Sequence, residues 1–337
     1  MRKIMQIDSN SNSPKYQQVI QAVIGAIEKK ALLQGDQLPS INELSSDLDI
    51  AKVTIAKAYE ELKEKGIILS QHGKGFFVAN TSVKVHLNIF ILFDTINPYK
   101  EILYQALRAA LPPDSQCSIF FHHHNLQQFE SLIKGNIGKY NYYVIMPHFD
   151  EDVSEVIKLI PPDKLLLLDK NVPKFQPACA AVHQDFRKDI ENALAEGETL
   201  IKKYRKLNLI LGKEHFQYVP AGIIKGAGNF CTKKGIKIEV ADNLVEKEIV
   251  AGEAYLIFSD SDLFRFIKHI NKMKWKAGRD IGLISYDETP MKELLLNGVT
   301  VISTDFALMG KTAGEMIIGR LTEKIANPAR LIKRSTL

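Results

Sequence analysis

The chain has 337 residues, 45% of them hydrophobic, and a formal net charge of +5. This length is enough for more than one domain with its own core, and the apolar content excludes a disordered chain. Residues 1–80 carry ten Lys and Arg against nine Asp and Glu, so bulk charge alone does not indicate a nucleic-acid partner.

The N-terminus and the cysteines indicate a cytoplasmic protein. The first residues lack the apolar stretch of a signal peptide, and no run approaches the roughly 18 apolar residues of a membrane span. Cys117, Cys179 and Cys231 are widely spaced and odd in number. That pattern argues against a disulfide framework or a zinc ribbon and is typical of small buried side chains in a reducing compartment. We expect no cofactor and no membrane partner.

The first part of the chain predicts helices with clear boundaries. Apolar residues at three- and four-residue spacing predict a helix over residues 14–30. Ser40 and Glu43 form a capping box that begins a second helix. Asp49 suits the tight turn that follows, because Asp tolerates a left-handed backbone better than most residues.

A third helix is predicted over residues 51–65, and Gly66 ends it. Its inward face is expected to consist of Ile55, Ala58, Tyr59 and Leu62. Two short strands should follow at residues 67–70 and 76–78, with Gly73, Lys74 and Gly75 at the tip between them. This order of elements is that of a winged helix-turn-helix, whose recognition helix enters the major groove of DNA.

The residues of this segment resemble the DNA-binding domain of GntR-type transcription regulators. The matching pieces are Pro14-Lys-Tyr-Gln-Gln-Val-Ile, Gly35-Asp-Gln-Leu-Pro-Ser-Ile-Asn-Glu-Leu, Thr54-Ile-Ala-Lys-Ala-Tyr-Glu-Glu-Leu and Gly73-Lys-Gly-Phe-Phe-Val. The resemblance implies sequence-specific binding to double-stranded operator DNA. The predicted DNA-binding residues lie on the second helix, the third helix and the tip: Ser40, Asn42, Lys52, Thr54, Lys57, His72, Gly73 and Lys74.

Three positions depart from the family. Asn42, Lys52 and Ala56 stand where arginine is common, and fewer guanidinium groups weaken the bidentate reading of guanine. Lys52 and Lys57 can still hold phosphates, Asn42 can read adenine or bind the DNA backbone, and Thr54 can donate to a phosphate.

After a polar connector at residues 80–86 the pattern changes to apolar runs with helices between them. The predicted strands are 87–93, 118–121, 142–146, 165–168, 207–211, 254–259, 281–286 and 299–303. Continuously apolar strands that alternate with helices predict an α/β class with doubly wound parallel sheets. We therefore expect a DNA-binding domain at 1–79, a linker at 80–86 and a two-lobed effector-binding and dimerisation domain at 87–337.

This second part resembles the effector domain of LacI-type repressors, which is related to periplasmic sugar-binding proteins. The matching pieces are Phe93-Asp-Thr-Ile-Asn-Pro-Tyr, Leu168-Asp-Lys-Asn-Val-Pro, Val182-His-Gln-Asp-Phe, Phe258-Ser-Asp-Ser-Asp-Leu, Ile281-Gly-Leu-Ile-Ser-Tyr-Asp-Glu-Thr-Pro and Val299-Thr-Val-Ile-Ser-Thr-Asp-Phe-Ala-Leu-Met-Gly. The resemblance implies a homodimer and a small-molecule effector, a monosaccharide or a sugar phosphate. It also implies effector contacts at Asp169, Ser261, Asp287 and Thr304.

Ligands of open α/β sheets bind beyond the carboxyl ends of the strands, which gives a wider set of candidates. They are Asn97, Tyr99, His148, Asp169, Lys170, His183, Asp185, Asp260, Ser261, Asp287 and Thr304. The family often has an arginine before the second-lobe helix, and here Tyr218 or Lys225 takes its place. Each of these aspartates has a structural alternative, as a helix cap or a turn residue.

The run His122-His-His suggests a metal at first sight. Three adjacent histidines on a strand end cannot all face one ion, and no carboxylate or cysteine follows at ligand spacing. We interpret the run as a partly exposed strand end, with a contact in the cleft as an alternative.

The sequence does not contain the catalytic motifs that we looked for. The pair Gly226-x-Gly lacks the rest of a dinucleotide fingerprint, and Gly-x-Ser-x-Gly does not occur. We expect a regulator rather than an enzyme, and family resemblance favours a repressor that its sugar releases. Two alternatives are a solute-binding receptor and a nonspecific architectural DNA-binding protein.

Overall fold

The computed structural model describes residues 7, 14–79, 87–213, 218–245 and 248–337. The predicted linker at 80–86 lies outside the described residues, so the domain limits stay a prediction. Among the described residues, no helix has the length and apolar character needed to cross a bilayer.

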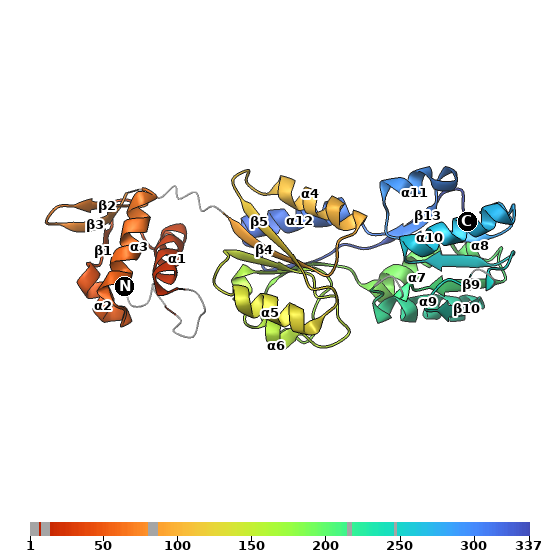
Figure 1. Cartoon of the computed structure of the whole chain (residues 1–337), viewed down its shortest axis with the longest axis horizontal. Helices are drawn as coiled ribbons and strands as arrows, with labels where there is room; N and C mark the ends of the chain where they lie inside the picture. The colour runs from red at the N-terminus through yellow and green to blue at the C-terminus, as the bar shows by residue number, and fades with distance from the viewer. Residues whose placement is uncertain (1–6, 8–13, 80–86, 214–217, 246–247) are drawn as a thin grey trace. The chain divides into compact units, whose positions relative to one another are not determined.

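The N-terminal part consists of three helices and a small antiparallel sheet, shown in red and orange in Figure 1. Its elements are α1 (Lys15–Glu28), β1 (Gln37–Leu38), α2 (Ile41–Leu48), α3 (Lys52–Glu64), β2 (Ile68–Gln71) and β3 (Gly75–Val78). Strand β3 lies between β1 and β2 and pairs antiparallel with both. These elements confirm the predicted winged helix-turn-helix and add β1, which the sequence did not predict.

The predicted local signals are present in this part. Ser40 Oγ accepts from Glu43 N at 3.2 Å, and Glu43 Oε2 accepts from Ser40 N at 2.8 Å, so the capping box begins α2. Asp49 adopts φ of 52° in the turn before α3. The predicted inward face of α3 is buried in the hydrophobic core of the N-terminal part. Residues of α1 and Leu44 of α2 belong to the same core.

The remaining chain forms two α/β lobes, each around a six-stranded sheet of described strands. Lobe 1 has strand order β14-β8-β7-β6-β4-β5. Its strands are β4 (Asn88–Phe93), β5 (Gln116–Phe121), β6 (Tyr142–Ile145), β7 (Leu165–Asp169), β8 (Ala180–His183) and β14 (Lys324–Ala326). Its helices are α4 (Pro98–Ala110), α5 (Leu126–Asn136), α6 (Ser154–Ile157) and α12 (Phe306–Gly319). Helices α4 and α12 lie on one face of the sheet, and α5 and α6 on the other (Figure 1).

Lobe 2 has strand order β10-β9-β11-β12-β13-β15, and only β15 runs antiparallel to its described neighbour. Its strands are β9 (Lys206–Ile210), β10 (Lys237–Ala241), β11 (Ala254–Ile257), β12 (Gly282–Tyr286), β13 (Thr300–Ser303) and β15 (Arg330–Ile332). Its helices are α7 (Phe186–Glu196), α8 (Glu198–Ile201), α9 (Ala221–Lys234), α10 (Asp260–Lys272) and α11 (Pro290–Leu294). The parallel pairs confirm the predicted doubly wound architecture.

The chain crosses between the lobes after β8, after β13 and after β14. The three crossings are tied together by hydrogen bonds around Asn327. Its backbone N donates to His183 O at 2.8 Å, and its Nδ2 donates to Thr304 Oγ1 at 2.6 Å. Thr304 Oγ1 also lies 2.7 Å from Asn327 O. We call Asn327 and Thr304 the hinge pair.

Candidate functional site

The outer side of α3 presents the polar residues that the sequence assigned to DNA. Lys52 and Lys57 are exposed, Thr54 is half-buried, and Val53 is 81% exposed at the start of the helix. Ala51, the N-cap residue, provides no side-chain cap. The first N–H groups of α3 are therefore left for water or for an anion such as a phosphate.

The wing and α2 lie on the same small domain. His72, Gly73 and Lys74 form the exposed turn between β2 and β3, and Gly73 adopts φ of +71°, which favours glycine. Lys74 O accepts from Gln37 Nε2 at 2.7 Å, and this bond fastens the tip to β1. Asn42 is exposed on α2, whereas the Ser40 hydroxyl serves as the helix cap. Direct contact of these residues with DNA stays a prediction.

In the α/β part, a cavity lies where strands of both lobes end. Its lining residues are Tyr99, His148, Asp169, Gln184, Phe186, Tyr218, Pro220, Ile223, Phe258, Tyr286 and Asp287. The space left among these side chains is about 20 Å³, which is room for one water. Sites for small molecules usually measure ~300 Å³ or more, so a sugar requires these side chains to move apart.

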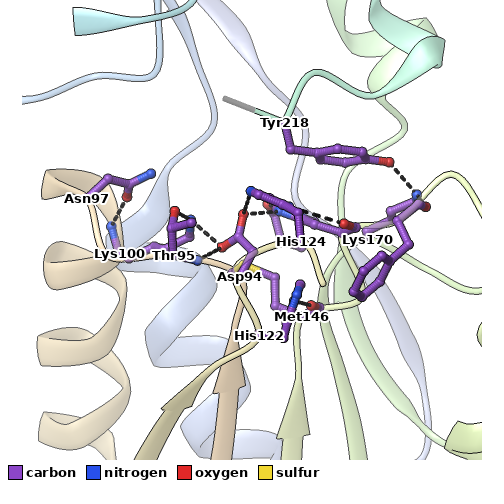
Figure 2. Close-up of polar contacts among 12 residues, drawn as sticks. Asp94, Thr95, Asn97, Lys100, His122, His124, Met146, Lys170 and Tyr218 are labelled. Atoms are coloured by element: carbon purple, nitrogen blue, oxygen red, sulfur yellow. Dashed lines mark hydrogen bonds and ion pairs between the residues drawn. The ribbon is translucent and has the colours of Figure 1, made fainter. Parts of the chain in front are cut away.

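A chain of buried polar side chains underlies the lobe 1 side of this cavity, and Figure 2 shows its first members. We call Asp94, Lys100, His148, Asp169 and Gln184 the lobe 1 polar cluster. Asp94 forms an ion pair with Lys100 and accepts from His148 Nδ1 at 2.9 Å. His148 Nε2 donates to Asp169 Oδ2 at 3.0 Å, and Asp169 Oδ1 accepts from Gln184 Nε2 at 2.6 Å.

Both ring nitrogens of His148 face carboxylates, so both carry protons and the ring is an imidazolium. Burial alone would lower the pKa of His148, but Asp94 and the hydrogen bond to Asp169 raise it. Burial would raise the pKa of Asp94, and the charges of His148 and Lys100 hold that pKa well below its usual range. The cluster therefore pairs two cations with two carboxylates and has no net charge.

Tyr218 of lobe 2 covers this cluster. Its ring stacks on His148 and His124 at centroid distances of 5.2 and 5.7 Å (Figure 2 shows the contact with His124). Its hydroxyl accepts from Lys170 Nζ at 2.6 Å and donates to Asp150 Oδ1 at 3.0 Å. These contacts join the lobes across the cavity, and separation of the lobes must break them.

Asp287 lines the cavity from lobe 2, directly after β12. It adopts φ of 61°, and its backbone N donates to Ile302 O at 2.9 Å. Burial raises the pKa of Asp287 to about 7, although Lys292 opposes the rise, and Asp169 adds to it. Lys292 is itself bonded to the backbone oxygens of Tyr286 and Asp287 and paired with Asp260 at 3.1 Å.

The structure brings five of the twelve predicted effector residues to the cavity: Tyr99, His148, Asp169, Tyr218 and Asp287. Lys170 lies beside them through its bond to Tyr218. Asp185 caps α7, as the structural alternative for the aspartates proposed, and Asn97 caps α4. Thr304 belongs to the hinge pair, Asp260 pairs with Lys292, and His183 ends β8. Ser261 is exposed on α10 and does not line the cavity.

Several residues of the cavity and of the polar cluster were not predicted from the sequence: Asp94, Lys100, Gln184 and Tyr286, as well as the apolar lining. Asp94 follows β4 directly, which is the same signal that selected Asp287 after β12. Gln184 follows β8, a strand that was not predicted. Tyr286 is the last residue of β12, which was predicted as a strand, but it was not among the predicted effector contacts.

The interpretation of the three histidines was wrong for His122. Its ring is fully buried, and its Nε2 lies 3.2 Å from Met146 O. Burial lowers the pKa of His122 to about 4, so the ring is neutral. His123 is exposed, whereas His124 contacts Tyr218. In the part of the chain that the structure describes, no group of three His, Cys, Asp or Glu residues could hold a metal ion.

In comparisons with known proteins, the N-terminal part and the α/β part each match a protein family. Residues 15–78 match the family of bacterial regulatory proteins named gntR, and residues 203–337 match the periplasmic binding protein-like domain. The HTH-type transcriptional repressor YtrA of Bacillus subtilis is 35% identical over 79 residues, 23% of this chain and 61% of YtrA. The HTH-type transcriptional repressor STM4068 of Salmonella typhimurium is 33% identical over 76 residues, 23% of this chain and 32% of that protein. The chain thus spans less than two thirds of these relatives.

Solved structures share the fold of the α/β part. A dimeric Lac repressor with a C-terminal deletion matches with a TM-score of 0.62 at 16% identity, over 74% of this chain and 98% of that one. A periplasmic binding protein/LacI transcriptional regulator of Alkaliphilus metalliredigens, complexed with D-xylulofuranose, matches with a TM-score of 0.58 at 14% identity over the same shares. The chain therefore joins a GntR-family helix-turn-helix domain to a periplasmic binding protein-like domain with the fold of LacI-family regulators.

Proposed function

We propose that the protein is a transcription regulator, a repressor, whose affinity for operator DNA is controlled by a small carbohydrate in the cavity between the lobes. The observation that carries this proposal is the joining of a GntR-family domain to a two-lobed domain whose cavity lies at the strand ends. The chain acts by binding and not by catalysis.

The DNA-binding half of the proposal rests on α3 and the wing. Lys52 and Lys57 bind phosphates, the uncapped N-terminus of α3 adds a further phosphate contact, and Val53 meets a thymine methyl group. A Lac repressor dimer bound to operator shares the α/β fold with a TM-score of 0.61 at 15% identity. By analogy, two chains pair and bind half-sites about one helical turn apart, ~34 Å, or a multiple of it.

The effector half rests on the two lobes and their polar cavity. Carboxylate, amide and hydroxyl groups bind sugar hydroxyls, and Tyr99 and Tyr218 supply aromatic faces for a sugar ring. The sugar must bind one arrangement of the lobes better than the other, because a ligand shifts an equilibrium only by its differential affinity. A coupling of ~1–3 kcal/mol is typical of such regulators.

The first test selects a binding sequence from random duplexes and measures affinity by fluorescence anisotropy. Lys52→Ala should lower the affinity and reduce the salt slope by about 0.9, because one phosphate is no longer neutralised by the protein. Lys65→Ala is the matched control, since Lys65 is an exposed lysine at the other end of α3, paired with Glu61 at 2.7 Å. Failure to select any preferred sequence would favour the architectural alternative.

The second test repeats the titration with pentoses, hexoses and their derivatives. An effector should change the operator affinity ~5- to 150-fold. A sugar that binds without any effect on DNA affinity would favour the solute-binding alternative.

A further inference from the structure

Two buried polar atoms in the cavity have no partner among the described residues. Gln184 is 6% exposed and Tyr286 is 5% exposed, and both line the cavity. The two unpaired atoms are Gln184 Oε1 and the Tyr286 hydroxyl oxygen. Buried polar atoms are seldom left unpaired in folded proteins, so a water or a ligand in the cavity must supply the partners of these two atoms. A ligand that displaces the water has to replace its hydrogen bonds.

The orientation of the Gln184 amide is fixed by its neighbour. Its Nε2 donates to Asp169 Oδ1 at 2.6 Å, and a carboxylate can only accept there, so the amide oxygen must point away from Asp169. The Tyr286 ring is held by Phe258 at a centroid distance of 4.9 Å. Asp287, the next residue, brings a carboxyl group to the same cavity. The Gln184 amide oxygen can only accept hydrogen bonds, whereas the Tyr286 hydroxyl and the Asp287 carboxyl group accept them and can also donate. All three groups can therefore accept from a donor on a ligand.

No Lys or Arg is among the described lining residues of the cavity. The His148 imidazolium does line it, but both of its ring nitrogens are already bonded to the carboxylates of Asp94 and Asp169. Of the nearby lysines, Lys100 is ion-paired with Asp94, and Lys292 binds two backbone oxygens and Asp260. Lys170 bonds to Phe149 O and to the Tyr218 hydroxyl. A phosphate here would face the Asp169 carboxylate beside cations that are already bonded, at a cost in desolvation and repulsion.

We propose that Gln184, Tyr286 and Asp287 form a subsite that accepts hydrogen bonds from hydroxyl or ammonium groups of the effector and excludes phosphorylated sugars. This inference rests on the proposed function and narrows the effector to an uncharged or amine-bearing sugar. Gln184 and Tyr286 are specificity-determining residues in this assignment, and each atom left unpaired by the protein is paired by the ligand.

The test is isothermal titration calorimetry of the full chain with aldopentoses, aldohexoses, hexosamines and their phosphate esters. Tyr286→Phe removes only the unpaired hydroxyl, so the variant should fold with an unchanged or higher Tm and bind the effector about tenfold more weakly. Tyr204→Phe is the matched control: the Tyr204 hydroxyl is also buried and unpaired among the described residues, but it lies in the lobe 2 core outside the cavity lining. This control should bind as the wild type does.

Each outcome is decisive. The subsite is supported if an uncharged or amino sugar binds and if Tyr286→Phe, but not Tyr204→Phe, weakens this binding. The affinities for a hexose and for its hexosamine then show whether the subsite prefers a hydroxyl or an ammonium donor. Binding only of phosphate esters, or equal affinity in both variants, overturns the subsite and leaves the proposed function standing. If no compound binds the wild-type chain, the sugar-responsive part of the proposed function falls, and the subsite falls with it.

Discussion

Asp287 lies in the cavity with a raised pKa, which makes the stability of the protein depend on pH. The folded chain keeps the Asp287 proton up to a pKa of about 7, whereas an ordinary aspartate releases it near 3.8. Between these values the folded state holds more protons than the unfolded state, so stability falls as pH rises from about 4 to 7.

We predict that Asp287→Asn removes this contribution. The free energy of unfolding of the variant should fall less between pH 4 and 7 than that of the wild type, as urea unfolding at several pH values would measure. Asp185→Asn is the control, because Asp185 is exposed and Asn also caps helices. Parallel curves for wild type and Asp287→Asn would show that Asp287 is ionised throughout this range.

Helices α4 and α12 approach each other closely at a glycine of α12. A Cβ on Gly310 of α12 would lie 2.2 Å from Leu103 O and 2.9 Å from Leu107 N of α4. Both obstacles are backbone atoms, which cannot move without shifting the helix. The close approach buries the inner faces of both helices against each other and against the lobe 1 sheet.

We predict that Gly310→Ala destabilises the protein by about 1–3 kcal/mol through overpacking. Gly228→Ala on α9 is the matched control, since a Cβ there meets nothing within 4 Å. Alanine is the better helix former by up to ~1 kcal/mol, so the control should be neutral or stabilising. Equal effects of the two substitutions in thermal unfolding would contradict the close packing of α4 on α12.

The sequence predicted those strands whose burial produces a recognisable hydrophobic pattern. All eight strands predicted for the α/β part occur. Seven lie inside their sheets, where parallel strands are buried on both faces and therefore continuously apolar, and the eighth, β5, is a half-buried edge strand. Strand β10 was missed because it lies at a sheet edge, where Lys237, Glu239 and other polar residues interrupt the run. Strand β1 has two residues, too few for any pattern, and β8 contains small alanines.

The cavity was predictable only in part. Strand-end aspartates such as Asp169 and Asp287 could be located, because the strands were located. Others at strand ends and helix starts, such as Asp185, cap helices instead, and the sequence alone does not separate the two uses. The polar cluster depends on distances between residues far apart in the chain. The sequence located the segment of Gln184 but selected its neighbours His183 and Asp185, because only the structure shows which of the three side chains faces Asp169.

For the whole molecule, the hinge pair joins all three crossings between the lobes. Asn327 links His183 at the end of β8 with Thr304 after β13, so a change in the angle between the lobes passes through these bonds. The hinge pair is buried and does not line the cavity.

We predict that Asn327→Ala weakens the coupling between effector and operator. Its stability should fall by about 1–3 kcal/mol because the side-chain hydrogen bonds are removed, and the effector should change operator affinity less than in the wild type. Asn192→Ala, on the exposed side of α7, should change neither. A variant with lower stability and full coupling, by anisotropy with and without effector, would show that the hinge pair only supports the fold.

Lobe 1 is built from two distant parts of the chain. Strands β4 to β8 precede lobe 2, whereas α12 and β14 follow almost all of it. On the ribosome, the DNA-binding domain is contiguous and can fold as soon as it emerges. Lobe 1 must wait, with the α4 face uncovered, until residues 306–326 have been made. A nascent chain therefore completes the helix-turn-helix domain well before it completes the cavity of the proposed effector.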